Sequence, residues 1–289
     1  MRVEDSLEAK KNLVEKELRR LLPSGDSILY RAMRYAVLSG GKRFRPLLLL
    51  SSGACFGVRR ETLLPFACAL EFIHNYSLIH DDLPSMDDDD FRRGKPSCHR
   101  VFGENIALLA GDGLLTLAFE IMAGAPVSAE LLPQKQEAIK TISQSAGASG
   151  MIGGQILDIT LEPENLTEEL VHELILKKTG ALIIAAVEVG AVLGRAQASE
   201  RRSIIDYGKN VGLAFQVRDD ILDFRHKGKR KSPPRPDFTD FLGLDRAKQR
   251  LQELVGKAVI SLEVFSRRAS ELRHLASSLL SLSPEARHG

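Results

Sequence analysis

Apolar residues recur along almost the whole chain with the spacing of an α-helix, three or four positions apart. Stretches in which apolar and polar residues alternate, which would predict half-buried strands, are nowhere convincing. Glycine, proline or polar residues separate the helical stretches. The predicted helices are an N-terminal stretch ending at Leu22 and residues 28–38, 46–55, 63–80, 105–123, 129–148, 167–193, 199–224 and 243–280. Because several of them are apolar on most sides, the sequence predicts an all-α bundle around a central element.

The composition is that of a globular protein with one core. Of the 289 residues, 44% are hydrophobic and 27% are charged, which is too apolar for a disordered chain. No shift in composition separates two cores, so we predict a single domain over residues 1–289. Lys and Arg number 40 against 38 Asp and Glu, a net charge of +2. A broad basic surface for nucleic acid is therefore not expected.

The sequence also favours a cytoplasmic protein. The N-terminal residues mix acidic and basic side chains and lack the apolar segment of a signal peptide. No uncharged apolar run reaches about 18 residues, so we expect no membrane span. Cys55, Cys68 and Cys98 are scattered along the chain, which argues against a disulfide framework or a zinc site.

Two acidic clusters each continue an apolar helix directly. The first, residues 81–90, reads DDLPSMDDDD, and the second, residues 219–223, reads DDILD. An acidic run by itself is most simply a solvated surface. Because both clusters project from core helices and not from a polar tail, we interpret them as sites that hold positive charge.

The two clusters differ in local geometry. Asp219 and Asp223 lie about 40° apart on a helix, so their carboxylates share one face. Pro84 interrupts the first cluster, so Asp81 and Asp87 meet only if the chain turns there. Carboxylates in ones and twos suit Mg²⁺ that keeps positions open for a substrate phosphate, and the spacing is unlike an EF-hand calcium loop. Two facing clusters would form a metal–diphosphate clamp.

Three cationic segments offer fixed positive charge for a diphosphate. Residues 40–46, GGKRFRP, place three cations beside a glycine pair, and residues 92–96, RRGKP, follow the first acidic cluster. Residues 177–180, KKTG, lie at a predicted helix break. Arg binds phosphate oxygens through two nitrogens, whereas Lys acts as a compact charge. Each segment alone indicates a solvated patch of charge. Their occurrence together with two acidic clusters is a far more specific indication of a diphosphate site.

Five segments, taken in order, carry a resemblance to a known family. They read GGKRFRP, EFIHNYSLIHDDLPSMDDDDFRRGKPSCHRVFGE, GGQILD, KKTG and FQVRDDILD. Together they resemble the head-to-tail trans-prenyltransferases (isoprenyl diphosphate synthases), closest to the bacterial short-chain enzymes that make farnesyl diphosphate. The resemblance covers residues 28–270. It implies an isoprenoid-synthase-type all-α bundle around a deep central cavity, a homodimer, and three Mg²⁺ ions in each active site.

The resemblance also implies roles for individual residues. It places the Mg²⁺ ligands at Asp81, Asp87 and Asp219, with the catalytic aspartates Asp82, Asp220 and Asp223 beside them. The residues implied to bind isopentenyl diphosphate are Lys42, Arg45, His74 and Arg93. Those implied to hold the allylic diphosphate are Arg92, Lys178, Thr179 and Gln216, with Gln155 and Asp158 in the polar cavity wall. Without the resemblance, His74 would be interpreted as a core histidine.

The implied chemistry needs no Ser/His/Asp nucleophile. Cations and Mg²⁺ neutralise the leaving diphosphate, so that the allylic C–O bond ionises to a delocalised carbocation. The isopentenyl double bond attacks this cation, and the released diphosphate takes the final proton. The apolar cavity excludes water, which would quench the cation.

The product length follows from an aromatic residue near the first acidic cluster. Tyr76 lies five residues before Asp81, where the family places the residue that stops the growing tail. With the two-residue expansion around Pro84, it resembles the pattern for a C15 product, farnesyl diphosphate. The alternative for Tyr76 is a plain core residue, and the alternative product is geranylgeranyl diphosphate.

The chain departs from the family after Asp223. The basic, proline-rich loop 225–240 is shorter than the corresponding loop of the family. Lys227 or Lys229 would take the place of the first lysine of that loop, Arg235 would take the place of the second lysine, and Phe238 would take the place of a tyrosine. This departure leaves a weakly active prenyltransferase partner subunit as an alternative. An ionising terpene cyclase is a further alternative, against which the GGKRFRP segment and the second acidic cluster argue.

Overall fold

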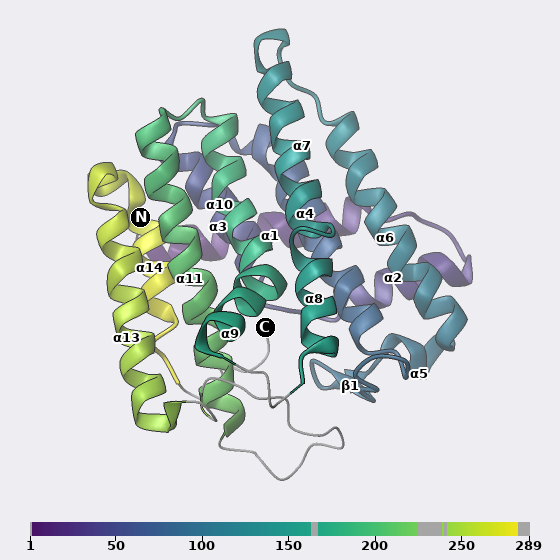
Figure 1. Ribbon diagram of the computed structural model, residues 1–289. Coiled ribbons are helices and arrows are strands. Elements are labelled where there is room, and N and C mark those ends of the chain that lie inside the picture. The colour runs from purple at the N-terminus through teal and green to yellow at the C-terminus, as the bar shows by residue number, and fades with distance from the viewer. Residues whose placement is uncertain (1, 163–166, 225–238, 240–241, 283–289) are drawn as a thin grey trace. The chain divides into compact units, whose positions relative to one another are not determined.

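A computed structural model describes residues 2–162, 167–224, 239 and 242–282. These residues form two compact units. Figure 1 labels their helices and strands. Among the described residues, unit 1 holds residues 2–50 and 60–129, and unit 2 holds residues 51–59 and 130–282.

Helices make up both units, which confirms the all-α prediction. Unit 1 contains α1 (Val3–Leu21), α2 (Ile28–Leu38), most of α3 (Phe44–Cys55), α4 (Arg60–Asp81), α5 (Cys98–Phe102) and α6 (Glu104–Gly124), with the antiparallel hairpin of β1 (Phe91–Arg92) and β2 (Lys95–Pro96). Unit 2 contains α7 (Leu132–Ala146), α8 (Met151–Thr160), α9 (Glu168–Ile175), the π-helix η3 (Leu176–Gly180), α10 (Ala181–Leu193), α11 (Ala198–Phe224), α13 (Leu244–Ser261), η4 (Glu263–Ala269) and α14 (Ser270–Ser278). The short 3-10 helix η1 (Ala129–Leu131) lies at the change from unit 1 to unit 2.

Helix α4 is the core of unit 1 and delivers the first acidic cluster. Its side chains Phe66, Leu70 and Ile73 are fully buried, each contributing about 1.5–3 kcal/mol of burial free energy. The helix packs against α1, α2 and α6. Its last residue is Asp81, so a buried element fixes the place where the acidic cluster begins.

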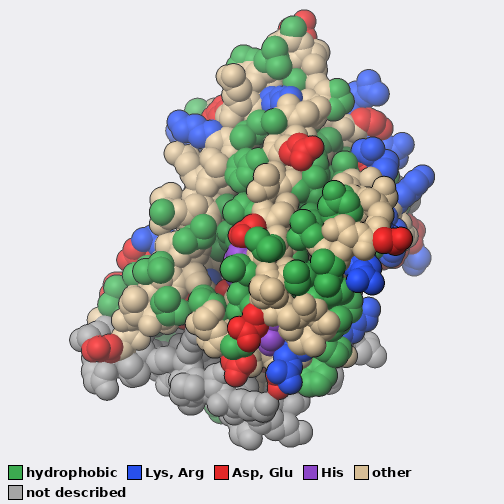
Figure 2. Space-filling model, turned by 90° about the vertical axis from the view of Figure 1, so that its right-hand side faces the viewer, with side chains coloured by type: hydrophobic (Ala, Val, Ile, Leu, Met, Phe, Trp, Pro, Cys, Tyr) green, Lys and Arg blue, Asp and Glu red, His purple; other side chains and the backbone are tan. Residues whose placement is uncertain are grey.

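Helix α6 is apolar and only partly covered within unit 1. It is long and apolar enough to cross a membrane, and it is the one such helix among the described residues. It packs against α2, α4 and α5 through a face that includes Ala110, Leu114 and Ala118. Its leucines Leu108 and Leu109 are 46% and 53% exposed, and Figure 2 shows hydrophobic side chains gathered on the face of the molecule that carries α6.

Helices α10 and α11 form the core of unit 2. Ten of the 13 residues of α10 are buried, and α10 packs against α7, α11 and η3. The end of α3 approaches α10 closely, because Ser52 Oγ donates a hydrogen bond to the Val187 carbonyl at 2.6 Å. A Cβ atom at Gly190 would lie 2.5 Å from the Gly53 nitrogen, so only glycine permits this approach. Helix α11 packs in turn on α13 and carries the second acidic cluster near its end.

The helix predictions were incomplete. Helices α5 and α8 were not predicted, and the stretch 243–280 is not a single helix, because it is kinked at Ser266, whose φ is +49°. In the stretch 167–193, the break predicted at residues 177–180 coincides with the π-helix η3. The β1–β2 hairpin was also not predicted, since it holds only two residues per strand. The single domain over residues 1–289 stays a prediction.

Candidate active site

The first acidic cluster forms the turn that its proline requires. After α4 ends, the Asp87 N–H donates to the Asp81 carbonyl at 2.9 Å, and the Asp88 N–H donates to the Leu83 carbonyl at 3.2 Å. These bonds bring Asp81 and Asp87 next to each other although six positions separate them. Both side chains are half-buried, so they offer carboxylate oxygens at the edge of unit 1.

Asp82 is buried and binds an arginine of the hairpin. Arg92 donates through Nε to Asp82 Oδ1 at 2.9 Å, and its Nη2 binds both Asp82 and Asp89. Burial raises the pKa of the Asp82 carboxyl above its usual value, and the Arg92 guanidinium partly offsets this effect. Two predicted site residues are thus in direct contact, and Asp89 is a partner that sequence reasoning missed.

His74 lies among cations. Burial lowers the pKa of its imidazole well below the usual value, and the positive charges of Arg45 and Arg93 lower it further. The imidazole is therefore neutral at pH 7, and one ring nitrogen carries a hydrogen that can be donated. Its charge environment places His74 near two of the residues implied to bind isopentenyl diphosphate.

The loop GGKRFRP does not present three cations to solvent. Arg43 is 1% exposed, and its side chain forms ion pairs with Glu15 and Glu71 at 2.7 and 2.8 Å. The interpretation of this segment as three diphosphate-binding cations was therefore wrong for Arg43. Lys42 and Arg45 flank the buried side chain on either side along the chain.

In unit 2, a glycine allows α8 to approach the π-helix η3 very closely. A Cβ atom on Gly154 would lie 2.2 Å from the Lys178 backbone nitrogen. This approach brings Asp158, one turn further along α8, to Lys178 Nζ, with which it forms an ion pair. Two residues implied to lie in the substrate site are therefore in contact, and the glycine of GGQILD is the reason.

A second close approach places the π-helix against α11. A Cβ atom on Gly212 would lie 2.8 Å from the Gly180 Cα atom. At this crossing Thr179 Oγ1 donates to Gln216 Oε1 at 2.9 Å, and Gln216 Nε2 donates to Asp220 Oδ1 at 2.8 Å. The KKTG segment and the second acidic cluster are thus joined by a chain of hydrogen bonds. Because π-turns are rare and often functional, this local geometry supports a role for the segment.

The second acidic cluster remains helical to its end. Helix α11 continues to Phe224, so Asp219 and Asp223 share a face as the sequence predicts. Asp219 pairs with the Arg218 guanidinium at 3.1 Å, and Asp220 is buried. The first cluster belongs to unit 1 and the second to unit 2.

Three predicted residues, Tyr76, Arg93 and Gln155, have a polar atom without a hydrogen-bond partner among the described residues. These atoms are the Tyr76 hydroxyl, Arg93 Nε and Gln155 Nε2, and all are buried. The Tyr76 ring contacts the His80 ring edge to face, with centroids 5.6 Å apart, and burial raises the pKa of its hydroxyl to about 12. The hydroxyl of Tyr76 is therefore neutral at pH 7.

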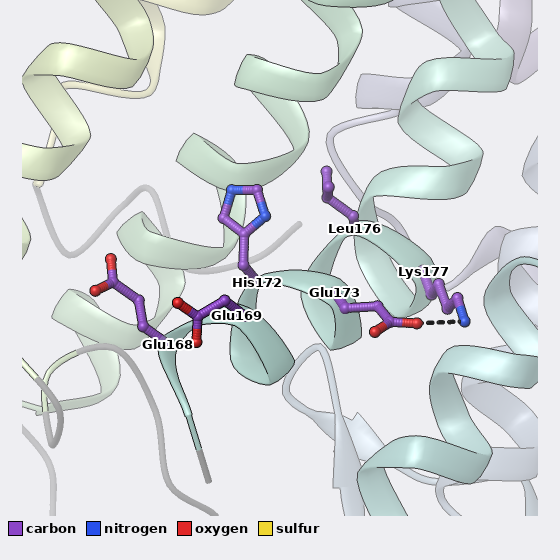
Figure 3. Close-up of a pocket in the computed structure, with 6 residues that line it drawn as sticks. All are labelled: Glu168, Glu169, His172, Glu173, Leu176 and Lys177. Carbon is purple, nitrogen blue, oxygen red and sulfur yellow. Dashed lines mark ion pairs between the residues drawn. The ribbon is translucent and has the colours of Figure 1, made fainter.

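Unit 2 also has an open pocket on α9 and η3. Its lining residues are Glu168, Glu169, His172, Glu173, Leu176 and Lys177 (Figure 3). Lys177 forms an ion pair with Glu173 at 2.7 Å, whereas Lys178 forms its ion pair with Asp158. The predicted loop residues Lys227, Lys229, Arg235 and Phe238 lie outside the described residues.

Comparison with known proteins gives a consistent result. A family model described as "Polyprenyl synthetase" matches residues 26–240. The chain is 42% identical to a farnesyl diphosphate synthase of Geobacillus stearothermophilus, covering 86% of this chain and 87% of that protein. It is 38% identical to a geranylgeranyl diphosphate synthase of Cyanophora paradoxa, covering 94% and 93% of the two chains. The solved structure of an FPP/GFPP synthase from Zymomonas mobilis matches with a TM-score of 0.89 and 36% identity, covering 96% of this chain and 99% of that one.

Proposed function

Since the chain belongs to the polyprenyl synthetase family, we propose that it condenses isopentenyl diphosphate with dimethylallyl or geranyl diphosphate, giving mainly farnesyl diphosphate and pyrophosphate. Membership makes it a prenyltransferase, and its relatives place it among the short-chain isoprenyl diphosphate synthases. The observation that carries the proposal is the turn that joins Asp81 to Asp87 at the end of a buried helix, next to a hairpin that bears Arg92 and Arg93.

The allylic diphosphate would be held by residues of both acidic and basic segments. In unit 2, Lys178 and Thr179 from η3 and Gln216 from α11 supply an ammonium, a hydroxyl and an amide. In unit 1, Arg92 supplies a guanidinium. Positive and hydrogen-bonding groups stabilise the charge that develops on the diphosphate as the C–O bond breaks. The departing group takes both electrons of that bond, which leaves the allylic carbocation.

Isopentenyl diphosphate would be bound by the cations of unit 1. Nε of Arg93 is buried and has no hydrogen-bond partner among the described residues, so this donor is available to a phosphate oxygen. Lys42, Arg45 and neutral His74 complete the proposed set. The double bond of this substrate then attacks the allylic carbon to form the new C–C bond, and the released diphosphate accepts the proton that is lost.

The aspartates of the first cluster fit a magnesium ion. Asp81 and Asp87 are adjacent in one turn and carry hard oxygen donors. Within the described ranges, no three His, Cys, Asp or Glu side chains are arranged to hold a metal by themselves. Magnesium commonly binds through one or two carboxylates together with substrate phosphates, so the donor set suits it. When bound, Mg²⁺ would neutralise part of the charge of the leaving diphosphate. We propose Asp81 and Asp87 of unit 1, and Asp219 of unit 2, as Mg²⁺ ligands.

The proposed C15 product depends on Tyr76. Its ring is buried on the same helix as Asp81, more than one turn earlier, where a bulky side chain would stop the growing tail. Relatives of about equal similarity make farnesyl and geranylgeranyl diphosphate, so geranylgeranyl diphosphate is the second candidate product.

A single product assay tests the proposal. The purified protein would be incubated with Mg²⁺, isopentenyl diphosphate and geranyl diphosphate, and the products analysed by chain length. A C15 product is expected; a C20 product would contradict the assigned length but not the reaction. A hydrocarbon formed from geranyl diphosphate alone would indicate a cyclase, and binding without turnover would indicate a partner subunit. Either of these two results would overturn the proposal.

A further inference from the structure

Arg43 has a buried side chain whose three nitrogens are all engaged. Nε binds Glu15 at 2.7 Å, Nη1 binds Glu71 at 2.8 Å, and Nη2 donates to the Val37 carbonyl at 2.7 Å. The guanidinium therefore links α1, α2 and α4 to the loop that carries Lys42. Because this side chain is fully buried and each of its nitrogens already has a partner, it is not placed to bind a substrate.

Glu71 continues the link toward the hairpin. Asn75 Nδ2 donates to the Glu71 backbone carbonyl at 2.8 Å and contacts its carboxylate at 3.4 Å. Asn75 Oδ1 in turn lies 3.4 Å from Arg93 Nη1, and the same nitrogen donates to the Gly40 carbonyl at 2.5 Å. The chain of contacts starts and ends on the GGKRFRP loop, so the loop and Arg93 are held as one arrangement.

The backbone at both ends of this chain is in an unfavourable conformation. Arg43 and Arg93 both have a φ of +54°, a region that few residues other than glycine adopt. Gly41 has a φ of +132°, and a Cβ atom there would lie 3.1 Å from the Arg93 guanidinium carbon. Unfavourable backbone of this kind persists where surrounding contacts enforce it, and it is common at functional sites.

From these contacts we propose that Arg43 and Glu71 are positioning residues, which hold Lys42, Arg45 and Arg93 in a fixed set for the diphosphate of isopentenyl diphosphate. The proposal rests on the proposed function. Stability alone is a poor explanation for the pair, because a buried ion pair often contributes no more than apolar residues of the same volume. A fixed arrangement of flexible cations lowers the entropy that substrate binding would otherwise cost.

Steady-state kinetics of Arg43→Lys and Glu71→Gln test the proposal. The first variant keeps the positive charge but cannot reach three partners, and the second keeps the shape of Glu71 but removes its charge. For both we expect the KM for isopentenyl diphosphate to rise about tenfold, as for the loss of one charged hydrogen bond. The KM for geranyl diphosphate should change less than about twofold, because none of its proposed binders is a member of this chain of contacts.

A third variant and a control distinguish a change in substrate binding from simple unfolding. Glu15→Gln alters the partly exposed end of the network, where folding is least at risk, and should raise the same KM about threefold. Glu188→Gln removes a carboxylate that pairs with Arg201 in unit 2, and it should leave both KM values as in the wild type. Thermal unfolding of each variant would be measured alongside.

The outcomes separate this inference from the proposed function. Suppose that the wild type condenses the substrates, but that the KM for isopentenyl diphosphate is unchanged in folded Glu15→Gln and in either buried variant. This result would overturn the positioning role and leave the proposed function standing. Equal increases of both KM values would mean a merely structural role and would also overturn it. If the wild type neither turns over nor binds isopentenyl diphosphate in a calorimetric titration, the proposed function fails and the inference with it.

Discussion

Tyr76 is the residue whose size is expected to set product length. In Tyr76→Ala the buried ring is removed from the helix that leads to Asp81, so the tail can extend further and C20 or longer products should appear. The loss of the ring should also cost about 3–5 kcal/mol of unfolding free energy, as for other aromatic truncations. Tyr76→Phe is the matched control, because the hydroxyl has no partner among the described residues. Chromatography of the products checks both; a C15 product from Tyr76→Ala would reject the assignment.

Asp81 is expected to affect the catalytic rate strongly and the folding of the chain only slightly. Its side chain is half-buried at the end of α4, and we propose it as a Mg²⁺ ligand. Asp81→Ala should lower kcat by about 10²–10³, the usual effect of removing one electrostatic stabiliser of the transition state. Asp206→Ala is the control, since Asp206 pairs only with Lys209 on the exposed face of α11 among the contacts found. Turnover by Asp81→Ala at the wild-type rate would refute the metal clamp.

The limit of sequence reasoning at this scale is clearest at Arg43. Lys42, Arg43 and Arg45 have the same charge and stand within four positions, so nothing local distinguishes them. The distinction comes from Glu15 and Glu71, each 28 positions from Arg43, which draw its side chain into the core. Long-range partners of this kind leave no signal in spacing or composition.

At the scale of elements, Gly154 controls the approach of α8 to η3. In Gly154→Ala the added methyl group would lie 2.2 Å from the Lys178 nitrogen, so one of the two backbones must move. We expect a loss of about 1–3 kcal/mol in unfolding free energy, as in other overpacked cores, and a clear fall in kcat because Lys178 is displaced. Chemical denaturation and steady-state kinetics would measure the two effects.

Gly256 provides the matched glycine substitution. It lies inside α13 with no atom within 4 Å of its would-be Cβ, so Gly256→Ala should stabilise the helix by up to about 1 kcal/mol and leave kcat unchanged. If Gly154→Ala were as stable and as active as Gly256→Ala, the close approach would have no functional importance.

The helices could be predicted where periodicity and breakers agree, and not elsewhere. The stretch 28–38 was predicted to the residue, because an apolar stripe ends at a glycine pair. Helix α8 was missed because Gly153 and Gly154 indicate a loop, while Gly154 in fact permits the contact with η3. The break predicted at KKTG coincides with the π-turn at Leu176–Gly180, but the sequence pattern does not distinguish a π-turn from an ordinary helix end.

At the scale of the whole molecule, the small net charge conceals separated charges. The chain carries +2 overall, yet each unit holds one acidic cluster together with cations of the proposed diphosphate sites. Asp82 with Arg92 in unit 1 and Asp158 with Lys178 in unit 2 are examples of this local pairing. Charges arranged in this way suit a small anion accompanied by metal ions, and they do not form the broad basic surface that nucleic acid requires.

The proposed homodimer is a prediction about the whole molecule that α6 makes testable. Leu108 and Leu109 are about half exposed on this apolar helix, and a stable interface buries about 800 Å² on each partner, with an apolar centre. We expect light scattering to give twice the 31.8 kDa chain mass for the wild type. The double variant Leu108→Glu/Leu109→Glu should give a monomer, because four charges would be buried in a symmetric contact.

A control variant distinguishes this effect from a general effect of added charge. Ile260 is 62% exposed on α13 of unit 2, so Ile260→Glu adds a charge at a comparably exposed apolar position on a different helix. It should leave the dimer intact. A wild type of monomeric mass at micromolar concentration would contradict the homodimer, and a dimer that survives the double leucine variant would place its interface elsewhere than α6. In the second case the exposed leucines would be ordinary surface residues, of the kind that every folded chain retains because polar side chains are too few to cover it.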